Sequence, residues 1–371
     1  MNSVKNITLI LSSLAFISCV DSSGHTDTEK ISSIIKKTAQ TKSYDTNGSI
    51  VKDNTLKDDG YYQKGIEPNY TRDNHTQIVT DHVTGLEWED TLSVSSETKT
   101  WLNKEITQKC RDEYENPKCP DEGCDICSDT SGDTAITYCS SLDLDGGGWR
   151  LPTAEELFFI VDKSKTSPSI NPIFKNINHN RWYYTSTISQ NHFLPVTVDF
   201  NEGYSVIDFP KLSAFKANVR CVRGDNPNSL NREFTRNIQG LVEEKKTKLE
   251  WQDNYDDNGE TIKKANWKGA IEYCESLELN GTNWRLPNIH ELYTILDEKG
   301  DLHQDFIFRG KYTWWSSTTY RGSIGGVLPS DNKGLNTIAW VRWGGKHAPY
   351  YSSGESKNRE QSVRCVRDIK Q

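Results

Sequence analysis

Residues 149–153 read Trp-Arg-Leu-Pro-Thr, and residues 284–288 read Trp-Arg-Leu-Pro-Asn. Three positions after the last residue of each stretch stands a glutamate, Glu156 or Glu291. A Thr or Asn followed by Glu at this spacing is a capping box, which opens a helix. The two stretches therefore predict short helices over residues 155–161 and 290–296.

The blocks on either side of these stretches also recur. In both copies a Leu-Glu-Trp block and a Tyr-Cys block come before, and a Thr-ended aromatic block and Val-Arg-Cys-Val-Arg come after. Recurrence of several blocks in the same order indicates an internal duplication. We expect one domain over residues 71–224, a second over 234–371, and a linker at 225–233.

The pattern within each block predicts mixed α and β structure. Leu-Glu-Trp alternates as a strand with Leu and Trp on one face, and residues 196–200 and 339–343 also alternate as strands. Residues 134–142 and 265–277 have the apolar stripe of an amphipathic helix. The tryptophans and arginines of the Trp-Arg-Leu-Pro blocks are expected to be structural. The rings of Trp149 and Trp284 would fill the cores, and Arg150 and Arg285 would pair with helix carboxylates.

The start of the chain predicts export. A short apolar run at residues 7–20 follows Lys5, as in a signal peptide, and is too short to span a bilayer. Residues 16–19 read Phe-Ile-Ser-Cys, which resembles a lipobox, so residues 1–19 would be removed as a lipoprotein signal with Cys19 acylated. Ordinary signal-peptidase cleavage is the alternative. Val20 after the cysteine favours an outer-membrane lipoprotein, facing the periplasm or the surface, and the polar composition of residues 20–70 predicts a flexible tether.

Eight cysteines remain beside Cys19, and an even number in an oxidising compartment implies four disulfides. In each copy the helix cysteine and the cysteine of the closing strand are both expected to point inward. Each bond would close a loop of more than 80 residues and stabilise the fold by about 4 kcal/mol. The predicted pairs are Cys139 with Cys221 and Cys274 with Cys365.

The first copy is longer than the second between its Leu-Glu-Trp block and its helix cysteine. This insertion holds Cys110, Cys119, Cys124 and Cys127. Two disulfides are the first interpretation in an exported protein, with three connectivities open, and a zinc site is the alternative.

These blocks resemble the Lcl C-terminal domain family over about residues 70–224 and 234–368. The resemblance implies a bacterial surface or periplasmic protein, and the best-known member is an adhesin whose trimeric C-terminal domain binds host glycosaminoglycans. The Trp-Arg-Leu-Pro-Thr block is also similar to one in sulfatase-modifying enzymes and the C-type-lectin-like fold. The expected fold is therefore α+β, with two tandem C-type-lectin-like, disulfide-closed domains. No collagen-like repeat precedes them, so the oligomeric state stays open.

The best candidate for ligand binding lies late in the second copy. If Ala339, Val341 and Trp343 face inward, Trp340 and Arg342 face outward together, ahead of a Gly-Gly loop. Aromatic faces stack on sugars, and cations pair with sulfate or carboxylate. An aromatic-rich strand without a ligand is the alternative. The predicted ligand-binding residues are Trp340, Arg342, Lys346, His347, Tyr350 and Tyr351. The first copy has an acidic turn at residues 201–203 instead, so binding is assigned to the second copy.

Other chemistry has weaker support. A net charge of −8 argues against a uniformly basic nucleic-acid surface, and no catalytic constellation is present. Residues 253–260 are rich in oxygen ligands, so calcium is one interpretation and a solvated acidic turn the other; no further cofactor is expected. We expect a non-catalytic envelope protein that binds glycans or surface proteins and meets the membrane only through its lipid. A structural or protein-binding scaffold is the alternative, and a sulfatase-modifying-like or glycoside-active enzyme a minor one.

Overall fold

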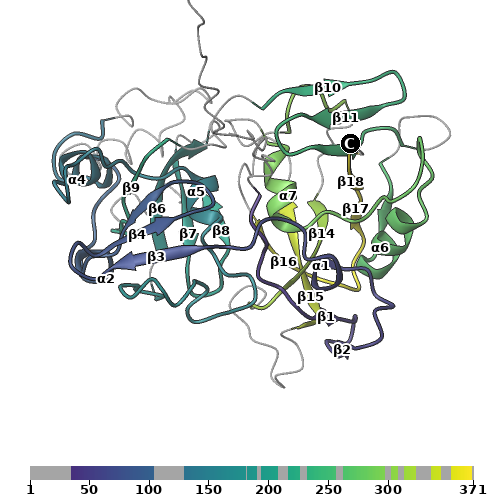
Figure 1. Ribbon diagram of the computed structural model, residues 1–371, viewed down its shortest axis with the longest axis horizontal. Coiled ribbons are helices and arrows are strands. Elements are labelled where there is room, and N and C mark those ends of the chain that lie inside the picture. The colour runs from purple at the N-terminus through teal and green to yellow at the C-terminus, as the bar shows by residue number, and fades with distance from the viewer. Residues whose placement is uncertain are drawn as a thin grey trace, which may run out of the picture. The chain divides into compact units, whose positions relative to one another are not determined.

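The described residues form both helices and strands, as the sequence predicts (Figure 1). The computed structural model describes residues 35–103, 129–180, 182–189, 194–207, 216–225, 232–255, 262–296, 302–307, 313–322, 336–343 and 352–369. All of these lie in one compact unit, Ser33–Gln371. Within these ranges, no helix has the length and apolar character needed to cross a membrane.

Each copy has a four-stranded antiparallel sheet that joins its beginning to its end. The Leu-Glu-Trp strand pairs with the closing strand, with Trp88 opposite Val222 and Trp251 opposite Val366. Both tryptophans are fully buried, as the alternation predicted. The strands, in sheet order, are β3 (Tyr70–Asp73), β4 (Ile78–Asp81), β5 (Glu87–Glu89) and β9 (Val222–Arg223), and then β10 (Phe234–Arg236), β11 (Leu241–Glu244), β12 (Leu249–Gln252) and β18 (Val366–Asp368).

Four helices occur where the sequence predicts them, each shorter than expected. They are α4 (Ala135–Ser141) and α5 (Ala154–Phe158) in the first copy, and α6 (Trp267–Glu275) and α7 (Ile289–Thr294) in the second; single turns form α1 (Asp59–Tyr62) and α2 (Ser93–Ser96). Both capping boxes are confirmed. The Thr153 and Asn288 side chains accept from the backbone N–H of Glu156 and Glu291, whose carboxylates accept from the cap N–H in return.

Two disulfides tie α4 and α6 to the ends of their copies. Cys139 bonds to Cys221 and Cys274 bonds to Cys365, with Cα–Cα distances of 5.4 and 5.5 Å. Both predicted pairs are confirmed, and all four cysteines are fully buried. The insertion cysteines (Cys110, Cys119, Cys124 and Cys127) lie outside the described residues.

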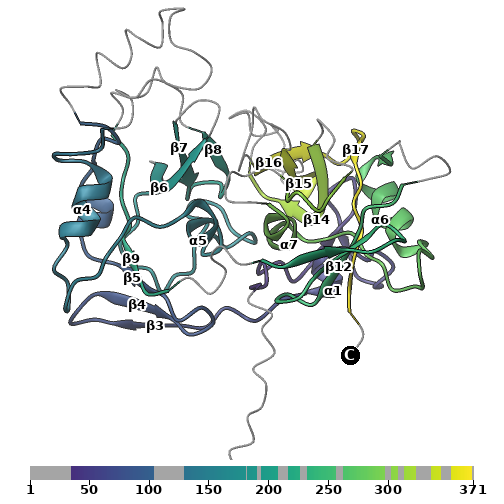
Figure 2. The ribbon, with the colours of Figure 1, turned by 90° about the horizontal axis from the view of Figure 1, so that it is seen from above.

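An eight-stranded sheet runs through both copies (Figure 2). Its strands, in sheet order, are β13 (Lys264–Ala265), β17 (Gln361–Ser362), β14 (Thr313–Tyr320), β15 (Ile338–Trp343), β16 (Ser352–Ser356), β8 (Ser205–Ile207), β7 (Leu194–Asp199) and β6 (Trp182–Ser189). The copies join where β16 pairs with β8, through Ser352 opposite Ser205.

The strands that meet at this junction are equivalent in the two copies. The N–H of Ala154, the first residue of α5, donates to Thr187 Oγ1 at 2.9 Å, and that of Ile289, the first residue of α7, donates to Thr318 Oγ1 at 3.0 Å. This shared contact makes β6 the counterpart of β14, and the strands that follow correspond in turn. The order β14-β15-β16-β8-β7-β6 therefore reads the same from either end.

Residues 35–66, which we call the strap, pack against both copies (purple in Figure 1). The strap contains α1 and the hairpin of β1 (Ser43–Tyr44) and β2 (Ile50–Val51). Lys36 forms a buried ion pair with Asp81 of the first copy, and Asp59 accepts from Thr318 of the second. The expectation of a flexible tether is therefore wrong for this part of residues 20–70. The strap docks through buried polar groups, which composition does not reveal.

Candidate functional site

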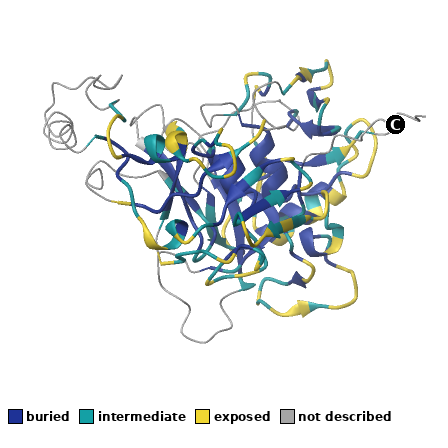
Figure 3. Ribbon diagram, turned by 60° about the vertical axis from the view of Figure 1, so that its left-hand side comes forward, coloured by how far each residue is buried: buried dark blue, intermediate teal, exposed yellow. Residues whose placement is uncertain are grey.

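The strand predicted to bind a ligand is covered on both sides. Ala339 and Val341 enter the core of the second copy, and Trp340 joins a different cluster on the opposite side, as alternation requires. However, Trp340 is 1% and Arg342 2% exposed. Figure 3 shows buried segments in dark blue through the middle of the ribbon. The expectation that these two side chains face solvent is wrong.

The cover over Trp340 comes partly from the first copy. The Trp340 ring lies 5.7 Å from that of Phe158 in α5, and Phe158 stacks on Tyr293 of α7 at 4.5 Å. Phe158 and Tyr293 are each the fifth residue of their helix, so equivalent residues meet where the copies join. Lys346, His347, Tyr350 and Tyr351 lie outside the described residues, and their role stays a prediction.

The Trp-Arg-Leu-Pro blocks are structural, as predicted. Arg150 donates to both carboxylate oxygens of Glu156 at 2.8 and 2.6 Å, and Arg285 to both of Glu291 at 2.6 Å. Trp149 and Trp284 are 3% and 1% exposed. The indole N–H of each donates to a nearby carbonyl, at 2.9 and 3.0 Å.

Asp253, the first residue of the acidic turn, is held by arginines. Its carboxylate lies 2.9 Å from Arg364 and 3.1 Å from Arg236, so it is engaged in ion pairs within the fold. Residues 256–260 of the turn lie outside the described residues. Elsewhere in the described chain, no group of three or more His, Cys, Asp or Glu side chains is placed to hold a metal ion.

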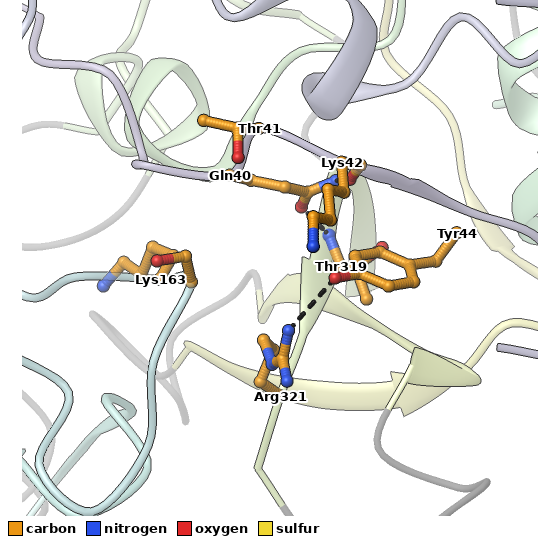
Figure 4. A pocket seen from close by; sticks show the side chains of 8 residues that line it. Gln40, Thr41, Lys42, Tyr44, Lys163, Thr319 and Arg321 are labelled. Carbon is orange, nitrogen blue, oxygen red and sulfur yellow. Dashed lines mark hydrogen bonds between the residues drawn. The ribbon is translucent and has the colours of Figure 1, made fainter. Parts of the chain in front are cut away.

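A polar cavity of about 190 Å³ lies where the strap meets both copies (Figure 4). It is lined by Gln40, Thr41, Lys42 and Tyr44 of the strap, Lys163 and Ser164 of the first copy, and Thr319 and Arg321 of the second. None of these residues is acidic, although the chain as a whole carries a net charge of −8. The cavity is therefore a locally positive site in an acidic protein.

Three hydrogen-bond donors gather in this cavity. The exposed Lys42 ammonium has no carboxylate partner among the described residues, and neither has the partly buried Arg321. Arg321 donates to Tyr44 Oη at 3.1 Å, which leaves the Tyr44 hydroxyl proton free to donate. Figure 4 shows the tips of these three side chains on the same side of the strap. Such a set of donors is suited to an anionic group.

Lys163 contributes its stem to the cavity and directs its amine away from it (Figure 4). The amine donates to the Phe158 carbonyl at 3.3 Å and lies 3.1 Å from the Phe158 ring centroid. Burial lowers the pKa of Lys163 well below its usual value. The positive charge of the cavity therefore comes from Lys42 and Arg321.

The wall behind the donors is fixed by further hydrogen bonds. Gln40 accepts from the Thr319 N–H at 2.6 Å, which joins the strap to β14. Lys357 donates to the Tyr44 carbonyl at 2.7 Å and to Thr319 Oγ1 at 3.0 Å. Burial lowers the pKa of Lys357 to about 7. These contacts position Tyr44 before any ligand arrives.

Sequence patterns did not reveal this site, because its residues come from three distant segments. Arg321 follows the Trp-Ser-Ser-Thr block by only a few residues, but Lys42 and Tyr44 lie in what composition predicts to be a tether. The available signal was that Lys42 and Arg321 had no ion-pair partner predicted from the sequence.

Comparison with known families places the repeated blocks in one group. Residues 77–223 and 240–367 each match the Lcl C-terminal domain, and together they make up more than half of the chain. Neither the curated proteins nor the solved structures gave a significant match. The two matched segments follow the duplication described above, and the chain accordingly belongs to the Lcl C-terminal domain family, with two tandem copies.

Proposed function

We propose that this protein is a non-catalytic binding lipoprotein of the cell envelope that recognises an anionic group of a glycan. The observation that carries the proposal is the cavity, where Lys42 and Arg321 face an empty space with no acidic residue in its lining. Charge-assisted hydrogen bonds from such groups are about twice as strong as neutral ones. An anionic sugar therefore fits this site better than an uncharged one.

The size of the cavity limits what enters it. Pockets for drug-sized ligands are usually about 300–1,000 Å³, and this cavity is about 190 Å³. It suits the charged substituent of one sugar ring, a sulfate ester or a carboxylate. The remainder of a longer glycan would lie on the surface beside the exposed Thr41 and Lys42.

The setting is consistent with a role outside the cytoplasm. Two disulfides with buried sulfurs are typical of exported proteins. Acylation of Cys19 would anchor the chain, and adhesion through glycans would follow from an outward-facing domain pair. Similarity to the C-type-lectin-like fold remains part of this proposal.

Isothermal titration calorimetry on the full chain tests the site. N-acetylglucosamine 6-sulfate and glucuronic acid supply the two anionic groups, and N-acetylglucosamine is the uncharged control. Losing one charge-assisted contact costs about 1.5–3 kcal/mol, so Arg321→Ala should weaken binding about ten- to a hundredfold. Binding should also weaken as salt increases.

Arg359→Ala is the matched control, because Arg359 is 71% exposed and, among the described residues, pairs only with Glu355 at 3.5 Å. It should bind like the wild type. If neither anion binds at millimolar concentration, or if the two arginine variants behave alike, the proposal is wrong. In that case the scaffold alternative is favoured.

A further inference from the structure

The cavity can hold a ligand only by joining three parts of the chain. Lys42 and Tyr44 belong to the strap, whereas Arg321 belongs to the second copy, and the first copy supplies Lys163 and Ser164. An anion in contact with Lys42 and Arg321 would therefore bridge the strap to the body of the protein.

The strap is attached mainly by polar contacts. At its start, Lys36 pairs with Asp81 and donates to Tyr70 Oη at 3.0 Å. Near its end, Asp59 accepts from Thr38 within the strap and from Thr318 of the second copy, the latter at 2.8 Å. Its buried apolar side chains in the core are limited to Ile35, Tyr44 and Leu56. Segments with few buried apolar contacts open more readily than cores do.

We propose that occupation of the cavity and docking of the strap are thermodynamically coupled. A bound anion clamps the strap to the body, and the docked strap completes the binding site. This inference rests on the proposed function, because it requires an anion in the cavity. A ligand that binds only the docked form lowers the population of the undocked form by the factor 1 + [L]/Kd.

The coupling would control how far the two copies reach from the membrane anchor. An undocked strap of 32 residues could extend by about 100 Å. A ligand in the cavity would hold those residues against the body. Binding would thus shorten the connection between the anchor and the domains.

Hydrogen exchange on the full chain tests strap docking, because a segment with one helical turn and one short hairpin does not keep its own hydrogen bonds once it leaves the body. The N–H groups of Lys37, Gln63 and Ile66 donate to carbonyls within the strap at 2.8–2.9 Å, and none of these residues lines the cavity. With N-acetylglucosamine 6-sulfate at ten times its Kd, their exchange should slow about tenfold. N-acetylglucosamine at the same concentration should have no effect.

Variants on the body of the protein separate coupling from simple shielding. Arg321→Ala leaves the strap sequence intact, yet at the same ligand concentration it should reduce the slowing from about tenfold to about twofold or less, whereas Arg359→Ala should retain it. If calorimetry shows binding but the three amides exchange at unchanged rates, the coupling is wrong and the proposed function stands. If calorimetry shows no binding to the wild type, both proposals fail.

Discussion

The two copies contain the same Arg–Glu contact at different depths, which allows its strength to be predicted. Arg285 and Glu291 are 4% and 3% exposed, whereas Arg150 is 38% exposed beside a Glu156 of 1%. Glu291→Ala would leave a buried guanidinium without its partner, which costs about 3–5 kcal/mol. Asp368 offers little compensation, because it lies 3.4 Å from Arg285 and is half exposed.

The equivalent change in the first copy should cost less. Glu156→Ala leaves Arg150 where water can reach it, so the loss is that of hydrogen bonds to a charged group, about 1.5–3 kcal/mol. Urea unfolding of the full chain, followed by tryptophan fluorescence, gives both values. Glu291→Gln is the control, because it removes the charge and keeps an acceptor for the Asn288 N–H. Equal losses in the two copies, or a larger loss in the first, would refute the argument from burial.

Four further outcomes are expected. Replacing both Cys274 and Cys365 by Ala should lower the free energy of unfolding by about 2–5 kcal/mol, and non-reducing peptide mapping should find two more disulfides within residues 110–127; zinc bound there would contradict this. Burial raises the pKa of Asp59 to about 7, so the folded state holds a proton that the unfolded state releases, and its contribution to stability should fall as pH rises from about 4 to about 7. Asp59→Asn should remove that part of the pH dependence in urea unfolding, and an unchanged slope would show that Asp59 does not titrate as described. Cys19→Ala should release the protein from the membrane fraction and prevent labelling by a palmitate analogue. A wild-type protein that takes up no label would contradict acylation of Cys19.

Local patterns in the sequence predicted much of each copy. The capping boxes at Thr153 and Asn288 placed the starts of α5 and α7, because a cap depends on residues only three positions apart. The pairing of Cys139 with Cys221 followed from two inward-facing positions. Such features depend on residues within one copy, and their recurrence in the second copy makes them recognisable in the sequence.

These local patterns did not predict the contacts between the two copies or between the strap and the copies. The alternation of residues 339–343 correctly placed Trp340 on the opposite side of the strand from Ala339 and Val341. It gave no information about Phe158 of the first copy, which covers that side. The strap was missed for a related reason. Lys36 and Asp59 look like tether residues until their partners, Asp81 and Thr318, are known.

The junction between the copies also explains why binding is not assigned to the second copy alone. In an isolated copy, β8 or β16 would be an open strand edge, and edges of this kind favour association. Here each covers the other, and the strap spans both copies. A site at this junction can use side chains that neither copy needs for its own fold. Among the described residues, five arginines of the second copy form ion pairs with carboxylates: Arg236, Arg285, Arg359, Arg364 and Arg367. Arg321 has no carboxylate partner among the described residues, and its charge is directed to the cavity and the strap.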